Sequence, residues 1–256
     1  MSHKDEYYNR AKQEGYRSRS AYKLKQLDEE ANLLRAGRSV VDLGAAPGGW
    51  LQVAKEAVGD GAVVGVDRNR IDPIEGVTTI RGDLTEPATQ ETIRERVGQV
   101  DLVLSDMAPN MTGEYSVDHA RSVHLARTAL TVAEGILVGG GDFVVKVFDG
   151  PDVAAFRTDL EGAFDHVRAI HPAASREASS EVYLVGKGHL TAPVRAGEER
   201  TVEITDVGAE GDGIAKVEGF TLFVPDTAVG DEVTVRVDEV KPRFGFAERV
   251  DPDDAG

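Results

Sequence analysis

Between residue 39 and about residue 190, the sequence alternates short apolar runs with segments of helical periodicity. Each run has four to six residues and is rich in valine, as is typical of strands buried on both faces of a parallel sheet. The runs are Ser39–Leu43, Ala62–Val66, Val77–Ile80, Val100–Leu104, Phe143–Phe148 and Val182–Val185. This alternation predicts a doubly wound α/β sheet with right-handed crossovers.

Helices are expected between the strands, at Trp50–Val58, Glu86–Val97 and Ser116–Val138. A leading amphipathic helix is also expected, because apolar side chains recur at helical spacing. These side chains are Ala21, Leu24, Leu27, Ala31 and Leu34. We therefore assign residues 1–38, a basic arm with this helix, and the core at 39–190 to one domain.

After Gly188 the pattern changes to short alternating strands broken by glycines: TVEITDVG, GIAKV, TLFVP and DEVTVRVDEV. Strands of this length and spacing, with no helical pattern among them, predict a small OB-like β-barrel at residues 192–250. The tail at 251–256 is expected to be frayed.

A glycine-rich turn, VVDLGAAPGGW, follows the first predicted strand. In open α/β sheets, ligands bind where the strands end, and this turn lies at the end of the first strand. The turn lacks the GxGxxG spacing of dinucleotide sites, and Pro47 removes an amide that a pyrophosphate would use. A sulfonium cofactor without phosphates fits this turn better.

Two acidic residues follow the next strands. Asp67 ends the second strand, where a carboxylate can accept hydrogen bonds from both ribose hydroxyls of an adenosyl group, and Asp83 follows the third, within reach of the adenine. Aspartates at strand ends are also common helix N-caps. Together with the glycine-rich turn, we interpret the pair as cofactor contacts.

Lys146 lies in the middle of an apolar strand, FVVKVF, where a lysine is costly to bury unless it is paired or functional. The alternative is a strand that ends early and leaves Lys146 exposed at the sheet edge. Asp106 ends the fourth strand, Glu181 begins the last, and Lys23 lies on the leading helix beside its apolar stripe.

Several motifs between Arg17 and Lys187 resemble, in order and context, the FtsJ/RlmE-type ribosomal RNA ribose 2′-O-methyltransferases. They are SRSAYKL, VVDLGAAPGGW, GVDRN, GDLT, VLSDMAPNMTG, FVVKVF and SSEVYLV. The resemblance implies a Rossmann-like sheet, S-adenosylmethionine as cofactor, no metal, and a catalytic tetrad of Lys23, Asp106, Lys146 and Glu181. It further implies a cofactor site formed by Gly48, Trp50, Asp67, Asp83 and Asp106.

The chemistry of this family needs such groups, because a ribose 2′-hydroxyl is a poor nucleophile at neutral pH. Lys146 is a candidate general base, and Lys23 and a cationic sulfonium would favour its neutral form. Asp106 and Glu181 favour the charged form instead. In that form the lysines would stabilise the developing alkoxide. The sequence leaves both roles open.

The net charge of −16 argues against a nucleic-acid partner, yet residues 1–38 carry nine bases and six acids. We attribute the acidity to a salt-rich cytoplasm, because molar salt shortens the Debye length to about 3 Å and weakens repulsion of RNA. An ordinary acidic protein with no polyanionic partner is the alternative. The expected partner is ribosomal RNA or the large subunit; for the N-terminal segment, a solvated amphipathic arm is the alternative to an RNA contact. Expected RNA contacts are Arg10, Lys12, Arg17, Arg19 and Lys25.

The predicted barrel resembles the TRAM domain of RNA-modifying enzymes over most of residues 192–250. Residues 192–256 hold seven bases against 16 acids, so any RNA contact is expected on a local face. That face comprises Lys216, Lys241, Arg243, Phe244 and Phe246. A structural or protein-docking role is the alternative.

The resemblance favours methylation of a uridine in large-subunit (23S) ribosomal RNA. A transfer-RNA ribose and a non-catalytic role in RNA binding or ribosome assembly remain as alternatives. The sequence has no cysteine, no apolar stretch of membrane-spanning length and a polar start unlike a signal peptide. We therefore expect a cytoplasmic protein with no membrane contact.

Overall fold

The computed structural model describes residues 3–175 and 180–250. The chain divides into two compact units, Met1–Lys187 and Gly188–Gly256. The tail at 251–256 lies outside the described residues. Within them, no helix has both the length and the apolar character that a membrane crossing requires.

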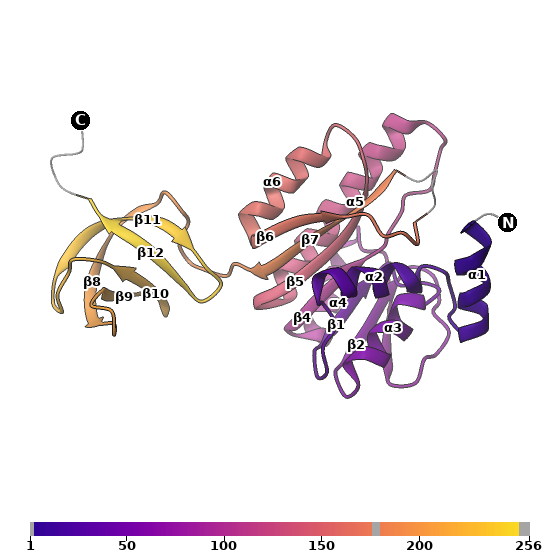
Figure 1. Ribbon diagram of the computed structural model, residues 1–256, viewed down its shortest axis with the longest axis horizontal. Coiled ribbons are helices and arrows are strands. Elements are labelled where there is room, and N and C mark those ends of the chain that lie inside the picture. Colours follow the sequence, from indigo (N-terminus) through magenta and orange to yellow (C-terminus); the bar gives the residue numbers. More distant parts are fainter. Residues whose placement is uncertain (1–2, 176–179, 251–256) are drawn as a thin grey trace. The chain divides into compact units, whose positions relative to one another are not determined.

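The first unit is built on a seven-stranded sheet of order β3-β2-β1-β4-β5-β7-β6 (Figure 1). Neighbouring strands from β3 to β5 pair in parallel, whereas β7 runs antiparallel to β5. The strands are β1 (Val40–Leu43), β2 (Val63–Asp67), β3 (Val77–Arg81), β4 (Val100–Ser105), β5 (Leu137–Phe148), β6 (Phe164–Ile170) and β7 (Glu181–His189). All six predicted apolar runs coincide with these strands, apart from Ser39 and Ala62 one residue before β1 and β2, so the predicted α/β sheet is confirmed.

The sequence analysis did not predict β6, which forms the edge of the sheet. Its sequence, FDHVRAI, buries Phe164, Val167 and Ile170 but exposes polar residues between them. An edge strand has no neighbour on one side and leaves polar residues in solvent, so it lacks a continuous apolar run.

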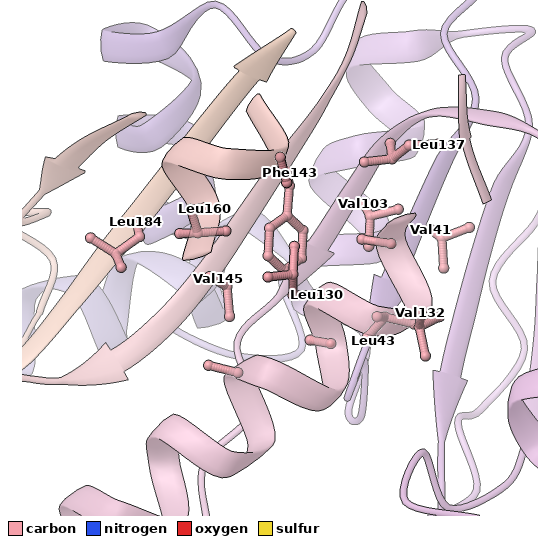
Figure 2. Packing of buried hydrophobic residues seen from close by; sticks show 14 of the residues in the cluster. Val41, Leu43, Val103, Leu130, Val132, Leu137, Phe143, Val145, Leu160 and Leu184 are labelled. Carbon is pink, nitrogen blue, oxygen red and sulfur yellow. The ribbon is translucent and has the colours of Figure 1, made fainter. Parts of the chain in front are cut away.

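The described residues of the same unit form six helices: α1 (His3–Glu14), α2 (Ala21–Ala31), α3 (Gly49–Val58), α4 (Pro87–Val97), α5 (Tyr115–Ile136) and α6 (Val153–Ala163). Side chains that alternate along the strands divide into two buried clusters. In β5, Phe143 and Val145 pack with α5 and α6 on one face (Figure 2), and Val144 packs with α2 and α3 on the other. Helices therefore cover both faces, as a doubly wound sheet requires.

The second unit contains a closed barrel of order β10-β12-β11-β8-β9. Its strands are β8 (Glu199–Val207), β9 (Gly213–Val217), β10 (Phe220–Val224), β11 (Glu232–Val240) and β12 (Phe244–Arg249). A two-residue turn joins β9 to β10, and both of its residues, Glu218 and Gly219, have positive φ, as tight hairpin turns require. Alternate residues such as Ile204, Leu222 and Val235 fill the interior. The predicted barrel is confirmed, although β12 was not predicted as a separate strand.

Candidate active site

The glycine-rich turn after β1 passes close to the loop that follows β4. Gly44 has φ +81°, and a Cβ on it would lie 2.2 Å from Cγ of Met107. The backbone amides of Gly44 and Ala45 donate to the carbonyl of Val66, at 2.8 and 3.1 Å, which ties the turn to β2. Glycine is therefore needed at residue 44 both for its backbone conformation and for space.

A cavity of about 570 Å³ opens beside this turn, where β1 to β4 end; we call it the strand-end cavity. Three carboxylates line it, those of Asp67, Asp83 and Asp106, as the sequence predicts for cofactor contacts. Other lining residues include Gly44, Ala46, Arg68, Asn69, Leu84, Met107, Asn110, Arg121, His124 and Leu125. The sequence analysis singled out none of these ten as a site residue, because most lie in loops without a periodic pattern.

Backbone amides hold two of the three carboxylates in place. Asp67 accepts hydrogen bonds from the amides of Ala46 (3.0 Å) and Asn69 (2.7 Å) and is almost completely buried. Asp83 accepts from the amide (2.9 Å) and hydroxyl (2.7 Å) of Thr85, and these bonds lower the pKa of its carboxyl. Both side chains are therefore fixed acceptors at the cavity wall.

The structure places Gly48 and Trp50 outside the residues that line the strand-end cavity. Gly48 is the residue before α3, with φ +109°, and a Cβ there would lie 3.0 Å from Ile74. The indole of Trp50 is 2% exposed and donates to the carbonyl of Ser20 at 2.7 Å. Its ring lies 5.9 Å from that of Tyr183, so Trp50 packs in the buried interior and does not form the cavity wall.

The four residues of the predicted tetrad form two ion pairs. Nζ of Lys146 donates to the carbonyl (2.6 Å) and to Oδ1 (2.8 Å) of Asp106, linking β5 to the end of β4. Nζ of Lys23, on α2, lies 2.5 Å from Oε1 of Glu181, at the start of β7. Lys146 is 8% exposed, and β5 lies between β4 and β7. The alternative of an exposed lysine at a sheet edge is therefore wrong.

Both carboxyls of the tetrad have a lowered pKa despite their burial. Burial acts to raise the pKa of Asp106, but Lys146, Lys23 and hydrogen bonds from Lys146 and Tyr183 outweigh it. Burial likewise acts to raise the pKa of Glu181, and the adjacent Lys23 outweighs it. Both groups are therefore carboxylates at neutral pH.

Tyr183 is a site residue that the sequence analysis missed. Its hydroxyl donates to Oδ1 of Asp106 at 2.6 Å, and its ring is completely buried, 5.7 Å from Nζ of Lys23. Burial raises the pKa of this phenol well above its ordinary value, so it stays a donor. The available signal was its position two residues after Glu181, on the same face of a strand.

A second cavity, of about 630 Å³, is lined by Lys23, Lys146 and Glu181; we call it the lysine cavity. Arg19, Ser20, Met111, Tyr115 and His119 also line it. Ala108 belongs to both cavities, and Asp106, in the strand-end cavity, is paired with Lys146, in the lysine cavity. The two cavities therefore adjoin at this ion pair, which is the arrangement a transfer between two bound molecules needs.

The predicted RNA-contacting residues differ in whether their charged groups already have partners within the protein. Arg17 donates to the carbonyls of Pro47, Asp72 and Pro73, and thereby holds loops beside the glycine-rich turn. Arg19 lines the lysine cavity and also donates to the carbonyl of Ala174.

The three other predicted contacts lie on α1 and α2. Arg10 pairs with Glu14 at 2.8 Å. Nζ of Lys25 lies 4.4 Å from the ring centre of Tyr16 and 3.7 Å from Glu14, and Lys12 is exposed. Two of the three cations are thus already engaged within the protein.

Comparison with known proteins agrees with this geometry. A model of FtsJ-like methyltransferases matches residues 16–189, and a model of the TRAM domain matches residues 193–250. The chain is 64% identical to the "Ribosomal RNA large subunit methyltransferase E" of Natronomonas pharaonis, covering 98% of this chain and 100% of that protein. It is 63% identical to the protein of the same name from Halorubrum lacusprofundi, covering 98% and 95%.

A solved structure is also similar. It is the crystal structure of a Plasmodium falciparum protein named as a ribosomal RNA methyltransferase, with a TM-score of 0.62 and 30% sequence identity. The match covers 68% of this chain and 98% of that one, which agrees with a shared methyltransferase sheet.

Proposed function

Since this chain belongs to the FtsJ-like methyltransferase family and ends in a TRAM domain, we propose that it methylates a ribose 2′-hydroxyl of large-subunit ribosomal RNA, at a uridine. The single observation that supports this most is the Lys146–Asp106 pair where the two cavities adjoin. The names of the archaeal relatives support the substrate. Such a substrate would place the protein in the cytoplasm.

The strand-end cavity fits S-adenosylmethionine. Its three carboxylates suit a ligand that is rich in hydrogen-bond donors and carries positive charge. We assign Asp67, which two amides hold, to accepting from the ribose hydroxyls, and Asp83, which Thr85 holds, to accepting from the adenine. When bound, the cofactor supplies a methyl group on a sulfonium, whose sulfur leaves as a neutral thioether.

Lys146 is the group that we propose to act on the 2′-hydroxyl. It already has two acceptors, the carbonyl and Oδ1 of Asp106. A neutral amine would give both of its hydrogens to them and keep its lone pair for the hydroxyl proton. An ammonium would keep a third hydrogen for the developing alkoxide. Both roles use the same position of Nζ, and Tyr183 fixes Asp106 in either case.

Lys23 and Glu181 would complete the acceptor side. Their ion pair borders the lysine cavity beside Lys146, and the pair is nearly buried. Removing either partner would leave an uncompensated charge there, which is strongly unfavourable in a buried setting. We propose that the Lys23–Glu181 pair orients the ribose and keeps the charges beside Lys146 compensated.

Among the N-terminal cations, the proposed phosphate contact with most support is Arg19, because it lines the lysine cavity. Lys12 is exposed, and Arg10, Arg17 and Lys25 would have to exchange or share their present partners. On the barrel, Phe223, Phe244 and Phe246 lie within 5.8 Å of one another by ring centres.

Phe244 and Phe246 are among the exposed large apolar side chains. The register sets Lys216 opposite Thr221 and Thr221 opposite Phe244. We propose this face for stacking on unpaired bases. Lys241 and Arg243, in the turn before β12, would contact the backbone there, although Lys241 is paired with Glu239 at 2.7 Å.

The test is transfer of labelled methyl from S-adenosylmethionine to undermodified ribosomal subunits and to bulk transfer RNA, in high salt, with Lys146→Ala alongside. Label in large-subunit RNA that resists alkaline cleavage at a uridine, and is lost with the variant, supports the proposal. Label only in transfer RNA would show that transfer RNA, and not ribosomal RNA, is the substrate. Cofactor binding without any methyl transfer would favour a non-catalytic RNA-binding or ribosome-assembly protein.

A further inference from the structure

Two large side chains lie exposed at the lysine cavity. Tyr115 is 60% exposed and Met111 is 62% exposed, and both line the cavity with Lys146 and Glu181. Among the described residues of this unit, the only other large apolar side chain of comparable exposure is Tyr8, on α1. Exposed apolar surface that gathers at a cavity indicates a binding surface.

Tyr115 is held in a fixed position despite its exposure. It is the first residue of α5, and its hydroxyl donates to the carbonyl of Asp149 at 2.6 Å. One face of its ring stacks on His119, with ring centres 6.3 Å apart and planes within 14°. The ring is therefore tied at its edge and backed on one side.

His119 is itself firmly placed, so that it supports the tyrosine. It is 2% exposed, its Nδ1 lies 3.0 Å from the carbonyl of Phe148, and its Nε2 accepts from the amide of Asp152 at 3.2 Å. Phe148 ends β5, two residues after Lys146. The strand that carries the proposed catalytic lysine thus also positions the support of the Tyr115 ring.

We propose that Tyr115 is the stacking platform for the base of the nucleotide whose ribose is methylated. A rigid aromatic ring with one supported face suits a planar base. Stacking there would orient the ribose toward Lys146 without reading the base edges. The inference rests on the proposed function, because it takes a nucleotide as the occupant of the lysine cavity.

The test compares Tyr115→Ala, Tyr115→Phe and Tyr115→Trp in methyl transfer to undermodified large subunits, at saturating S-adenosylmethionine. We expect Tyr115→Ala to lower kcat/KM by about 5- to 150-fold, the effect of losing one base stack. Tyr115→Phe and Tyr115→Trp, which keep a ring, should stay within about threefold of the parent. Cofactor affinity should not change in any of the three, and the melting temperature should fall by less than about 4 °C, because the lost bond to Asp149 lies at the surface.

Two outcomes would overturn the inference. Parent-like activity of Tyr115→Ala would show that no base stacks there. A loss in Tyr115→Phe as large as in Tyr115→Ala would show that the bond to Asp149, and not the ring, matters.

A second measurement does not depend on methyl transfer, and so separates this inference from the proposed function. A uridine oligonucleotide should quench the fluorescence of the Tyr115→Trp protein, but not that of the parent, whose tryptophan at residue 50 is buried. Quenching of the Tyr115→Trp protein, combined with no methyl transfer by the parent, would refute the proposed function but still support base stacking at residue 115. Absence of quenching would refute base stacking at residue 115.

Discussion

Replacing Tyr183 by phenylalanine removes the single hydroxyl that contacts Asp106 of the tetrad and leaves the ring in place. That hydroxyl donates to Oδ1 of Asp106 at 2.6 Å inside a fully buried environment. A hydrogen bond to a charged group contributes about 1.5–3 kcal/mol when it is buried. For a unit of this size, each kcal/mol lost lowers the melting temperature by about 2–4 °C. We therefore expect Tyr183→Phe to melt roughly 4–8 °C lower, for a loss of about 2 kcal/mol.

The same change should also slow methyl transfer. Without the phenol, the pKa of Asp106 rises and its hold on Lys146 weakens. We expect kcat to fall about tenfold, equivalent to about 1.4 kcal/mol of transition-state stabilisation. KM for the cofactor should change little, because the strand-end cavity keeps all its lining residues.

Tyr16→Phe is the matched control. The hydroxyl of Tyr16 donates to Oε2 of Glu56 at 2.5 Å, but the bond lies at the protein surface, away from both cavities. Water replaces a lost surface bond, so that variant should lose less than about 1 kcal/mol and keep its kcat. Equal melting temperatures for the two variants, by calorimetry in the same buffer, would refute the reasoning.

Three further predictions follow from the same region. Asp42 is 1% exposed, and burial, then Asp106 and Asp67, raises the pKa of its carboxyl well above the ordinary value. A carboxyl with a raised pKa stabilises the fold below its ordinary value, about pH 4, and this stability is lost as pH rises from there toward the raised pKa. Asp42→Asn should therefore remove a decline in unfolding free energy that begins above about pH 4. Gly44→Ala, whose Cβ would overlap Met107, should weaken cofactor binding more than tenfold by calorimetric titration. Because the pKa values of Asp106 and Glu181 are lowered in the fold, their carboxylates stabilise it at any pH above the ordinary carboxyl pKa of about 4. Protonation of Asp106 and Glu181 should therefore lower the melting temperature only below about pH 4. The Asp42→Asn protein, which lacks the Asp42 titration, is the one to measure, and a melting temperature that already falls near pH 6 on acidification would contradict this prediction.

The sequence was informative wherever burial or a strand end imposed a pattern. Six valine-rich runs predicted six strands, because a strand covered on both faces has few polar residues. The carboxylates of Asp67, Asp83 and Asp106 were expected to lie together, and the structure brings them to one cavity, since parallel strands end at the same edge. The structure likewise pairs the tetrad residues across the first unit.

The directions of individual side chains could not be predicted from burial patterns or strand ends. Trp50 lies in the glycine-rich motif, yet its indole turns toward Ser20 and Tyr183, away from the strand-end cavity. Arg17 looked like a free phosphate ligand, but folding brings three backbone carbonyls to its guanidinium. Neither contact follows from periodicity, because both join segments that lie 30 or more residues apart in the sequence.

Salt connects the electrostatics of the site to the choice of RNA contacts. The chain carries a net charge of −16, which we attribute to a salt-rich cytoplasm. In molar salt the Debye length is about 3 Å, so exposed cations contribute little to holding phosphates, whereas buried pairs are screened much less.

The Lys146–Asp106 and Lys23–Glu181 pairs are nearly buried and should keep their strength under these conditions. In such salt, recognition of RNA would depend on contacts that release few counterions, and base stacking is such a contact. An acidic protein can therefore act on RNA if aromatic surfaces bind the bases and a buried charge network does the chemistry. The exposed rings of Tyr115, Phe244 and Phe246 are the surfaces that we propose for this role.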